Sequence, residues 1–186
     1  MKFKLNRKSI SNIVFVIAVL VLLYPPSREW FMGKIAFSPS IKSEDKIEQL
    51  QSTNWQLKNI KTNETLNFNE FENKVVFVNF WATWCPPCRA EMPMIQDLYN
   101  TYKEEVVFLM VTNENWKKVN TYFTKNNYDL PTYNSLSSPP KNLTETNSIP
   151  ASYLIDKNGN IRVSKVGAAK WNSSNMIEFI DKLIKE

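Results

Sequence analysis

The feature that most constrains this chain is a pair of cysteines, Cys85 and Cys88, which are the only two among its 186 residues. The run 75–80 ahead of them is almost wholly apolar and is typical of a buried strand. The residues after them carry apolar side chains at helical spacing. A disulfide that closes so short a loop restrains little unfolded-chain entropy, but a thiolate at a helix N-terminus is stabilised. Strand, C-x-x-C and helix in this order therefore indicate a redox-active dithiol.

Other uses of two cysteines are disfavoured by the rest of the sequence. A structural zinc site needs four ligands, usually Cys and His, and this chain has no third Cys and no His. Attachment of a c-type haem needs C-x-x-C-H, and Arg89 stands where the His would be. A purely structural disulfide is disfavoured because its loop is so short. We therefore expect no metal and no cofactor.

The remaining elements follow from apolar spacing and turn residues. Residues 55–60 and 65–68 are expected to form a hairpin, and residues 106–111 a second fully apolar strand. The helix after the cysteines should run to about residue 103. Later elements are expected as a helix capped by Asn113, an extended piece at 130–133, a hairpin of 151–155 with 161–166, and a last helix from about residue 173.

The connections between these elements predict how the strands pair. The apolar strands 75–80 and 106–111 are joined by a helix, so they should be parallel with a right-handed crossover. The strands 151–155 and 161–166 are joined by a tight turn and must be antiparallel. The sequence thus predicts an α/β fold in which a mixed central sheet carries helices on both faces.

Residues 75–93, VVFVNFWATWCPPCRAEMP, closely resemble the TlpA/ResA/CcmG group of membrane-tethered, extracytoplasmic thiol–disulfide oxidoreductases. The resemblance extends from about Trp55 to the C-terminus, and residues 148–156 are similar to the cis-proline strand of that group. It implies a thioredoxin fold, with an N-terminal β-hairpin and a strand and helix inserted before the cis-proline strand.

The resemblance also implies roles for the site residues. Cys85, whose sulfur we expect to be exposed at the helix N-terminus, would be the nucleophile. Cys88, one turn into the helix and more buried, would resolve the mixed disulfide. Pro150 would be the cis-proline facing the dithiol, and Ile149 would offer backbone groups to an extended substrate. An ordinary trans proline that opens a strand is the alternative.

The residues next to the cysteines bear on substrate contact and on redox potential. Prolines are tolerated in a first helical turn, but Pro86 and Pro87 supply neither amides nor a cation to the Cys85 thiolate. We therefore expect a moderately lowered thiol pKa and a reducing potential. Trp84 is expected on the exposed surface beside the site. The candidate substrate-binding residues are Trp84, Pro86, Pro87, Ile149 and Pro150.

Glu91 is the candidate proton carrier. It lies three residues after Cys88 and returns to the same side of the helix, where the resembling reductases also carry an acid. If partly buried it would have a raised pKa and could exchange protons with Cys88. The alternative is an exposed glutamate that merely suits the helix dipole. Asn79, where plain thioredoxins place a buried Asp, cannot titrate, which favours Glu91 for this role.

The N-terminus has the pattern of an export signal. Lys2, Lys4, Arg7 and Lys8 precede an apolar run at 13–24, which is short for a spanning helix of about 20 residues. No small-residue cleavage site follows, which favours an uncleaved signal anchor over a signal peptide. We expect residues 1–24 to be this segment, 25–48 a tether and 49–186 one thioredoxin-like domain. The resemblance then places the domain in the periplasm, anchored to the bacterial inner membrane.

Charge gives no support for nucleic-acid binding. Apart from the four basic residues of the N-terminus, residues 9–186 carry 19 Lys and Arg against 18 Asp and Glu, a net charge of +1. The pI near 9.1 therefore owes much to the targeting segment.

The leading functional hypothesis is reduction of disulfides in exported proteins, among them apocytochrome c before haem attachment. A membrane thiol reductant transporter would recharge the dithiol. A disulfide oxidase or isomerase would use the same chemistry in the other direction. A thiol peroxidase needs P-x-x-x-T-x-x-C, whose Thr would fall at Ala82. A copper metallochaperone spaces its cysteines by three residues and adds a distant His, which this chain lacks.

Overall fold

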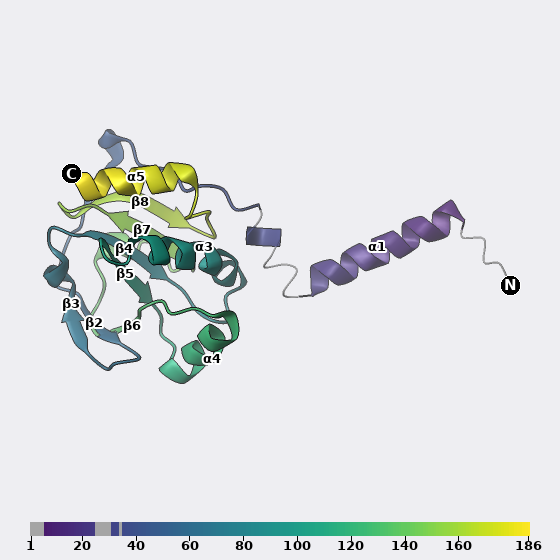
Figure 1. Ribbon diagram of the computed structural model, residues 1–186, viewed down its shortest axis with the longest axis horizontal. Coiled ribbons are helices and arrows are strands. Elements are labelled where there is room, and N and C mark those ends of the chain that lie inside the picture. The colour runs from purple at the N-terminus through teal and green to yellow at the C-terminus, as the bar shows by residue number, and fades with distance from the viewer. Residues whose placement is uncertain (1–5, 25–30, 34) are drawn as a thin grey trace.

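The structure is a computed structural model that describes residues 6–24, 31–33 and 35–186 (Figure 1). Its sheet has eight strands in the order β1-β8-β7-β4-β5-β6-β2-β3. The strands are β1 (Glu48–Gln49), β2 (Gln56–Asn59), β3 (Thr65–Asn67), β4 (Val75–Phe80), β5 (Val106–Val111), β6 (Thr132–Ser135), β7 (Ala151–Ile155) and β8 (Asn160–Val166). β4 pairs in parallel with β5 and antiparallel with β7, so the predicted mixed sheet is confirmed.

β4 and β5 form the centre of the sheet because both are apolar on both faces. They pair in register from Val75 opposite Val106 to Phe80 opposite Val111, and α3 (Pro86–Tyr102) connects them. Burial of so many Val, Leu and Phe side chains stabilises the fold by roughly 1.5–3 kcal/mol for each side chain that is fully buried. The carboxyl end of β4 thus leads the chain directly into the loop that carries the cysteines.

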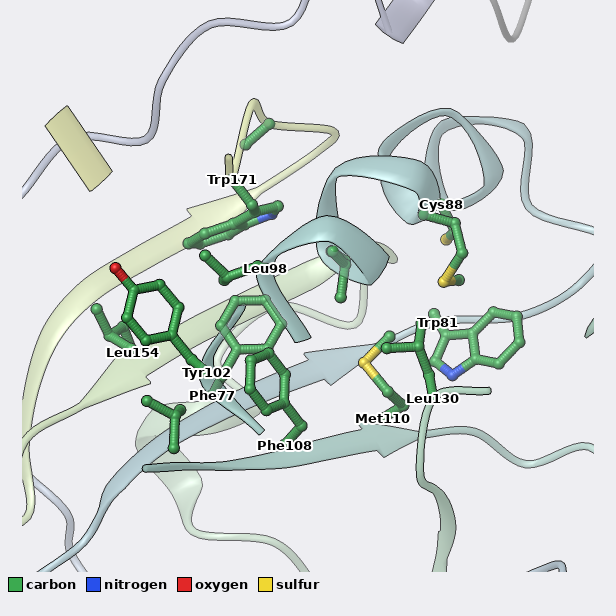
Figure 2. Close-up of a cluster of buried hydrophobic side chains, with 14 of the residues drawn as sticks. Phe77, Trp81, Cys88, Leu98, Tyr102, Phe108, Met110, Leu130, Leu154 and Trp171 are labelled. Atoms are coloured by element: carbon green, nitrogen blue, oxygen red, sulfur yellow. The ribbon is translucent and has the colours of Figure 1, made fainter. Parts of the chain in front are cut away.

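The two faces of the sheet are covered differently. Side chains from α3, α4 (Trp116–Asn126) and α5 (Ser174–Lys185) pack in one cluster with Phe77 and Phe108. Figure 2 shows part of this cluster, with Leu98 and Tyr102 of α3 labelled. The opposite face, which Val76 and Val78 share, is covered by Trp55 and by the 3-10 helices Phe68–Phe71 and Lys141–Leu143. Helices therefore lie on both faces as expected, but the three α-helices that cover the sheet all lie on one.

The direction of the crossovers explains this asymmetry. β4, β5 and β6 are neighbours in chain order and run parallel to one another. Both right-handed crossovers therefore proceed the same way across the sheet, and they place α3 and α4 on the same face.

The cap of α4 differs from the sequence prediction. Asn115, not Asn113, is the N-cap, and its side chain accepts a hydrogen bond from the backbone N–H of Lys118. Both positions are Asn, a preferred N-cap residue, so residue type alone could not distinguish them. At the other end of α4, Asn127 takes the left-handed conformation with φ of 57°, which Asn tolerates better than most residues.

The predicted hairpin and insertion are both present. β2 pairs antiparallel with β3 and also with β6, so the hairpin extends one edge of the sheet. Between the cysteines and Pro150 the chain forms β5, α4 and β6 in addition to the rest of α3. The hairpin of β7 and β8 is confirmed as well.

Part of the segment expected to be a tether is joined to the sheet. Ile41 forms a bridge with Val163, the backbone N–H of Lys42 donates to the Arg162 carbonyl at 2.8 Å, and β1 pairs with β8. Residues 25–30 and 34 of that segment lie outside the described residues. The division into signal, tether and domain otherwise stays a prediction.

The N-terminal segment contains the helix α1 (Arg7–Leu23), and residues 1–5 lie outside the described part of the chain. Several apolar side chains of α1 are exposed, Phe15 by 69% and Val14 by 60%. Among the helices of the described ranges, none combines the length and the apolar character needed to cross a membrane.

Candidate active site

Cys85 and Cys88 form a disulfide at the N-terminus of α3. Cys85 is the N-cap residue, and the backbone N–H of Cys88 donates to its Sγ at 3.3 Å. The Cys88 amide and the helix dipole at this position favour negative charge on the sulfur. After reduction, the same contacts would stabilise a thiolate at Cys85.

The exposure expected for Cys85 is wrong for the disulfide form. Cys85 is only 2% exposed and Cys88 is fully buried. The Sγ of Cys85 is bonded to that of Cys88 and lies 3.8 Å from the carbonyl oxygen of Ile149, which together shield it from solvent. The neighbouring Trp84, in contrast, is 69% exposed, as expected.

The Ile149–Pro150 peptide bond is cis, which confirms that prediction. It precedes β7, and the Ile149 carbonyl faces the sulfur of Cys85. In the disulfide neither of these two atoms carries a hydrogen, so the 3.8 Å approach is a contact without a donor. A Cys85 thiol would be able to donate to this carbonyl.

The two prolines between the cysteines occupy the first turn of α3. Pro86 is exposed and Pro87 is half-buried, so the outer side of the disulfide carries a rigid, uncharged surface. The structure thus brings Cys85, Cys88, Ile149 and Pro150 together.

Glu91 is fully buried, which excludes the exposed alternative. Its Oε1 accepts from Asn79 Nδ2 at 2.8 Å, and its Oε2 accepts from the backbone N–H of Ala169 and from Trp171 Nε1, each at 3.1 Å. Burial raises the pKa of Glu91 from 4.5 to about 7, and these hydrogen bonds together with the Lys165 charge offset part of that rise. The carboxyl group therefore changes its protonation state near neutral pH.

Sequence reasoning missed most of the partners of Glu91. Asn79 is opposite Ser152 in the register of β4 and β7, and its Nδ2 also donates to the Ser152 Oγ at 2.7 Å. Ala169 and Trp171 come from the loop between β8 and α5. The one available signal was the presence of polar residues, Asn79 and Ser152, in otherwise apolar strands. That the two meet depends on strand order, which spacing does not give.

Trp81 directly follows β4 and packs against α4. Trp81 is buried, and its ring stacks on Phe123 of α4 at 5.5 Å between centroids; Figure 2 shows it beside Cys88.

In the part of the chain that the structure describes, no group of three or more His, Cys, Asp or Glu side chains could hold a metal ion.

Comparison with known sequences identifies the family. Residues 42–180 match the Redoxin family. A thiol–disulfide oxidoreductase ResA from Oceanobacillus iheyensis is 30% identical in an alignment of 172 residues that covers 88% of this chain and 85% of the relative. A second ResA, from Halalkalibacterium halodurans, is 31% identical in an alignment of 138 residues that covers 73% of this chain and 76% of the relative.

Solved structures show the same fold at lower identity. A protein from Chlorobium tepidum, described as a thiol:disulfide interchange protein DsbE, superposes with a TM-score of 0.60 at 20% identity, covering 74% of this chain and 98% of its own. A secreted thiol–disulfide isomerase from Corynebacterium glutamicum gives 0.59 at 20% identity, covering 79% and 92%. The fold is thus the predicted thioredoxin fold. The chain belongs to the Redoxin family and is a thiol–disulfide oxidoreductase of the kind that its ResA relatives represent.

Proposed function

We propose that this protein is a membrane-tethered, extracytoplasmic reductase that transfers electrons from the Cys85–Cys88 dithiol to disulfides of exported proteins. The observation that carries the proposal is the disulfide at the N-terminus of α3, facing the Ile149 carbonyl of the cis peptide. An extended substrate beside Ile149 would have its own disulfide next to Cys85.

The chemistry follows from this arrangement. The Cys85 thiolate attacks one sulfur of the substrate disulfide, a mixed disulfide forms, and the other substrate sulfur leaves as a thiolate. Cys88 then attacks the Cys85 sulfur, which restores the enzyme disulfide and releases the second substrate thiol. Two electrons pass to the substrate, and the two protons of the dithiol go to the substrate thiols or to solvent.

Glu91 is assigned the proton step at Cys88. It lies one turn of α3 beyond Cys88, and its pKa of about 7 lets it accept and release a proton near neutral pH. Its hydrogen bonds to Asn79 and to the 169–171 loop fix the orientation of the carboxyl group.

The direction of electron flow is inferred from the residues between the cysteines. Pro86 and Pro87 offer no cation and no amide to a Cys85 thiolate, so the reduced form is only moderately stabilised and the potential should be low. Low potential is what a reductase requires.

Location and partners rest on the N-terminal segment and on the resemblance to the membrane-tethered group. The basic start and the exposed apolar side chains of α1 support residues 1–24 as an anchor, with the catalytic domain outside the cytoplasmic membrane. The substrates would be exported proteins, including apocytochrome c, and a membrane thiol reductant transporter would return the dithiol to its reduced form.

The test is the midpoint potential of the full chain in neutral detergent, measured against defined dithiol and disulfide buffers at pH 7. We expect a value near or below that of thioredoxin, about −270 mV. A value near −120 mV, typical of a strong oxidant, would reverse the direction of electron flow and contradict the proposal.

A further inference from the structure

A groove of about 630 Å³ lies beside the redox centre, between the loop that carries the cysteines and the outer side of α4. Thr83 and Arg89 line its first side; Thr83 is two residues before Cys85, and Arg89 directly follows Cys88. The groove therefore begins at the residues that flank the disulfide. The function proposed above does not use it.

Three contacts join α4 and the residue Glu114 before it to residues that flank the disulfide in the sequence. The Trp81 ring stacks on Phe123 with an interplanar angle of 6°, and the Arg89 guanidinium lies 5.6 Å from the centroid of the Tyr122 ring. Thr83 donates to the Glu114 carboxylate through its backbone N–H at 2.6 Å and through its Oγ1 at 2.9 Å. The position of the groove relative to Cys85 is thus set by contacts of α4 and of the residue Glu114 that precedes it.

The lining of the groove is cationic. It includes Arg89, Lys117, Lys118 and Lys125, and no lining residue is acidic. α4 itself contains no acid, and the acid that precedes it, Glu114, is engaged by Thr83. With the residues that the structure describes, the three lysines form no salt bridge, and all three are exposed.

This charge is a local feature of the molecule. Residues 9–186 carry 19 basic and 18 acidic residues, so a groove whose lining includes four cations differs from the nearly neutral domain around it. A lysine-rich helix face is often only a solvated surface. Here the cations are gathered within one groove, and that groove includes residues that flank the disulfide in the sequence.

We propose that this groove binds an acidic stretch of polypeptide that adjoins the disulfide with which Cys85 reacts. The inference rests on the proposed function and specifies a class of substrate for the same site. Cations beside the reacting sulfur would attract an acidic partner during encounter and hold its chain along α4. Lys117 and Lys125 lie eight residues apart on α4, so they can contact acidic residues over about 12 Å.

The experiment measures single-turnover reduction of synthetic peptides by the pre-reduced full chain in neutral detergent at pH 7.5. Each peptide contains one intramolecular disulfide, flanked on one side by three Glu, three Gln or three Lys. In the reaction the dithiol becomes the Cys85–Cys88 disulfide, and the peptide disulfide becomes two thiols. Acid quenching and mass spectrometry report the rate.

We expect the Glu peptide to react about tenfold faster than the Gln peptide at low ionic strength, and the Lys peptide to react more slowly than both. At about 0.5 M salt the difference between the Glu and Gln peptides should fall to within about twofold, because the charges are screened. In the triple variant Lys117→Gln/Lys118→Gln/Lys125→Gln, the Glu-to-Gln rate ratio should fall close to one.

A matched variant controls for net charge. Lys74, Lys103 and Lys185 are also exposed, but they lie near the start of β4 and at the C-terminal ends of α3 and α5, away from the cysteines. Changing all three to Gln removes the same charge and should keep the wild-type rate ratio. Thermal unfolding of both triple variants verifies that each is folded.

The outcomes separate this inference from the proposed function. Equal rates with the Glu and Gln peptides in the wild-type protein, or an equal loss of preference in the control variant, would overturn the groove proposal alone. If the pre-reduced protein reduces none of the three peptides, the proposed reductase function itself is contradicted.

Discussion

At the residue scale, the central feature is a buried carboxyl group with three hydrogen-bond donors. Asn79, Ala169 and Trp171 donate to Glu91 from β4 and from the loop before α5. These donors lower the cost of ionisation, but burial still has the larger effect on the pKa of Glu91. The site therefore holds a group that is neutral in mild acid and charged above neutral pH.

The raised pKa of Glu91 predicts a stability that falls as pH rises. Its folded-state pKa, about 7, lies above the value of 4.5 for an exposed Glu, so the contribution is fully present below about pH 4.5 and is lost as pH rises through 7. The loss should be about 3 kcal/mol. Urea unfolding of the oxidised protein between pH 4 and 8 measures it.

Glu91→Gln provides the comparison, because Gln keeps one acceptor oxygen, replaces the other oxygen with an amide NH2 group and does not titrate. This variant should remove most of the pH dependence between pH 4.5 and 7. If the variant and the wild-type protein show the same pH dependence of unfolding free energy, Glu91 is not the titrating group.

Pro86→His tests how the dithiol is tuned. An imidazolium in the first turn of α3 would add a cation near the Cys85 thiolate and stabilise the reduced form. We expect the midpoint potential to become less negative by about 30 mV or more, where 30 mV corresponds to about 1.4 kcal/mol. Pro86→Gln controls for loss of the proline ring. Equal potentials for the His and Gln variants would show that charge at this position has no influence.

At the element scale, α4 links the redox centre to the cationic groove, so its N-terminus is a useful place to perturb. Asn115 caps the helix with its side chain, whereas Asn113, two residues earlier, does not. The two asparagines therefore form a natural pair of variant and control.

Asn115→Ala should lower stability by about 1 kcal/mol, because the backbone N–H of Lys118 loses its acceptor. In a domain of this size the change corresponds to a Tm lower by about 2–4 °C. Asn113→Ala should change Tm by much less. Differential scanning calorimetry measures both, and a larger effect at Asn113 would contradict the assignment of the cap.

The elements that the sequence predicted best are those with a continuous apolar pattern. β4 and β5 agree with the predicted bounds, because a strand buried on both faces is an uninterrupted run of Val, Phe, Leu and Met with a single polar residue. The helix after the cysteines and the cis bond before Pro150 were also predicted, the latter from resemblance.

Features that depend on distant partners could not be read from spacing. β1 has only two residues, and the Ile41 bridge has one, so neither carries a periodic pattern. Burial of the Cys85 sulfur depends on the Ile149 carbonyl, which is 64 residues away. The cationic groove combines Thr83 of the loop before α3 and Arg89 of α3 with residues of α4, and only the fold brings these together.

At the scale of the whole molecule, Arg162 joins three separate parts of the chain. Its guanidinium lies 3.2 Å from Asp156, 3.3 Å from Glu44 and 3.5 Å from Glu186. It also lies 5.5 Å from the centroid of the Phe179 ring. The segment before β1, the turn between β7 and β8 and the C-terminus therefore meet at one buried cation.

Arg162→Met should destabilise the fold by roughly 2–4 kcal/mol, because the Asp156 carboxylate would stay buried without its counter-ion. Lys182→Met is the control: Lys182 pairs with Glu186 on the surface, where such a pair contributes at most about 1 kcal/mol. Guanidinium unfolding compares the two variants. A similar loss of unfolding free energy in both variants would show that the buried cluster contributes no more to stability than the surface pair.

The segment that joins the sheet at Ile41 also sets the largest distance between residue 24 and the domain that carries the disulfide. The Phe37 carbonyl accepts from the backbone N–H of Lys170, which is adjacent to the Ala169 amide that holds Glu91, so the chain arrives at the redox end of the domain. Twelve residues, 25–36, lie between Tyr24 and Phe37, and the thirteen Cα-to-Cα steps from one to the other can span about 45 Å at most. With residues 1–24 as the proposed anchor, a membrane-bound electron donor would meet the dithiol at a high effective concentration. The donor could then recharge the dithiol rapidly even if its affinity for the domain were weak.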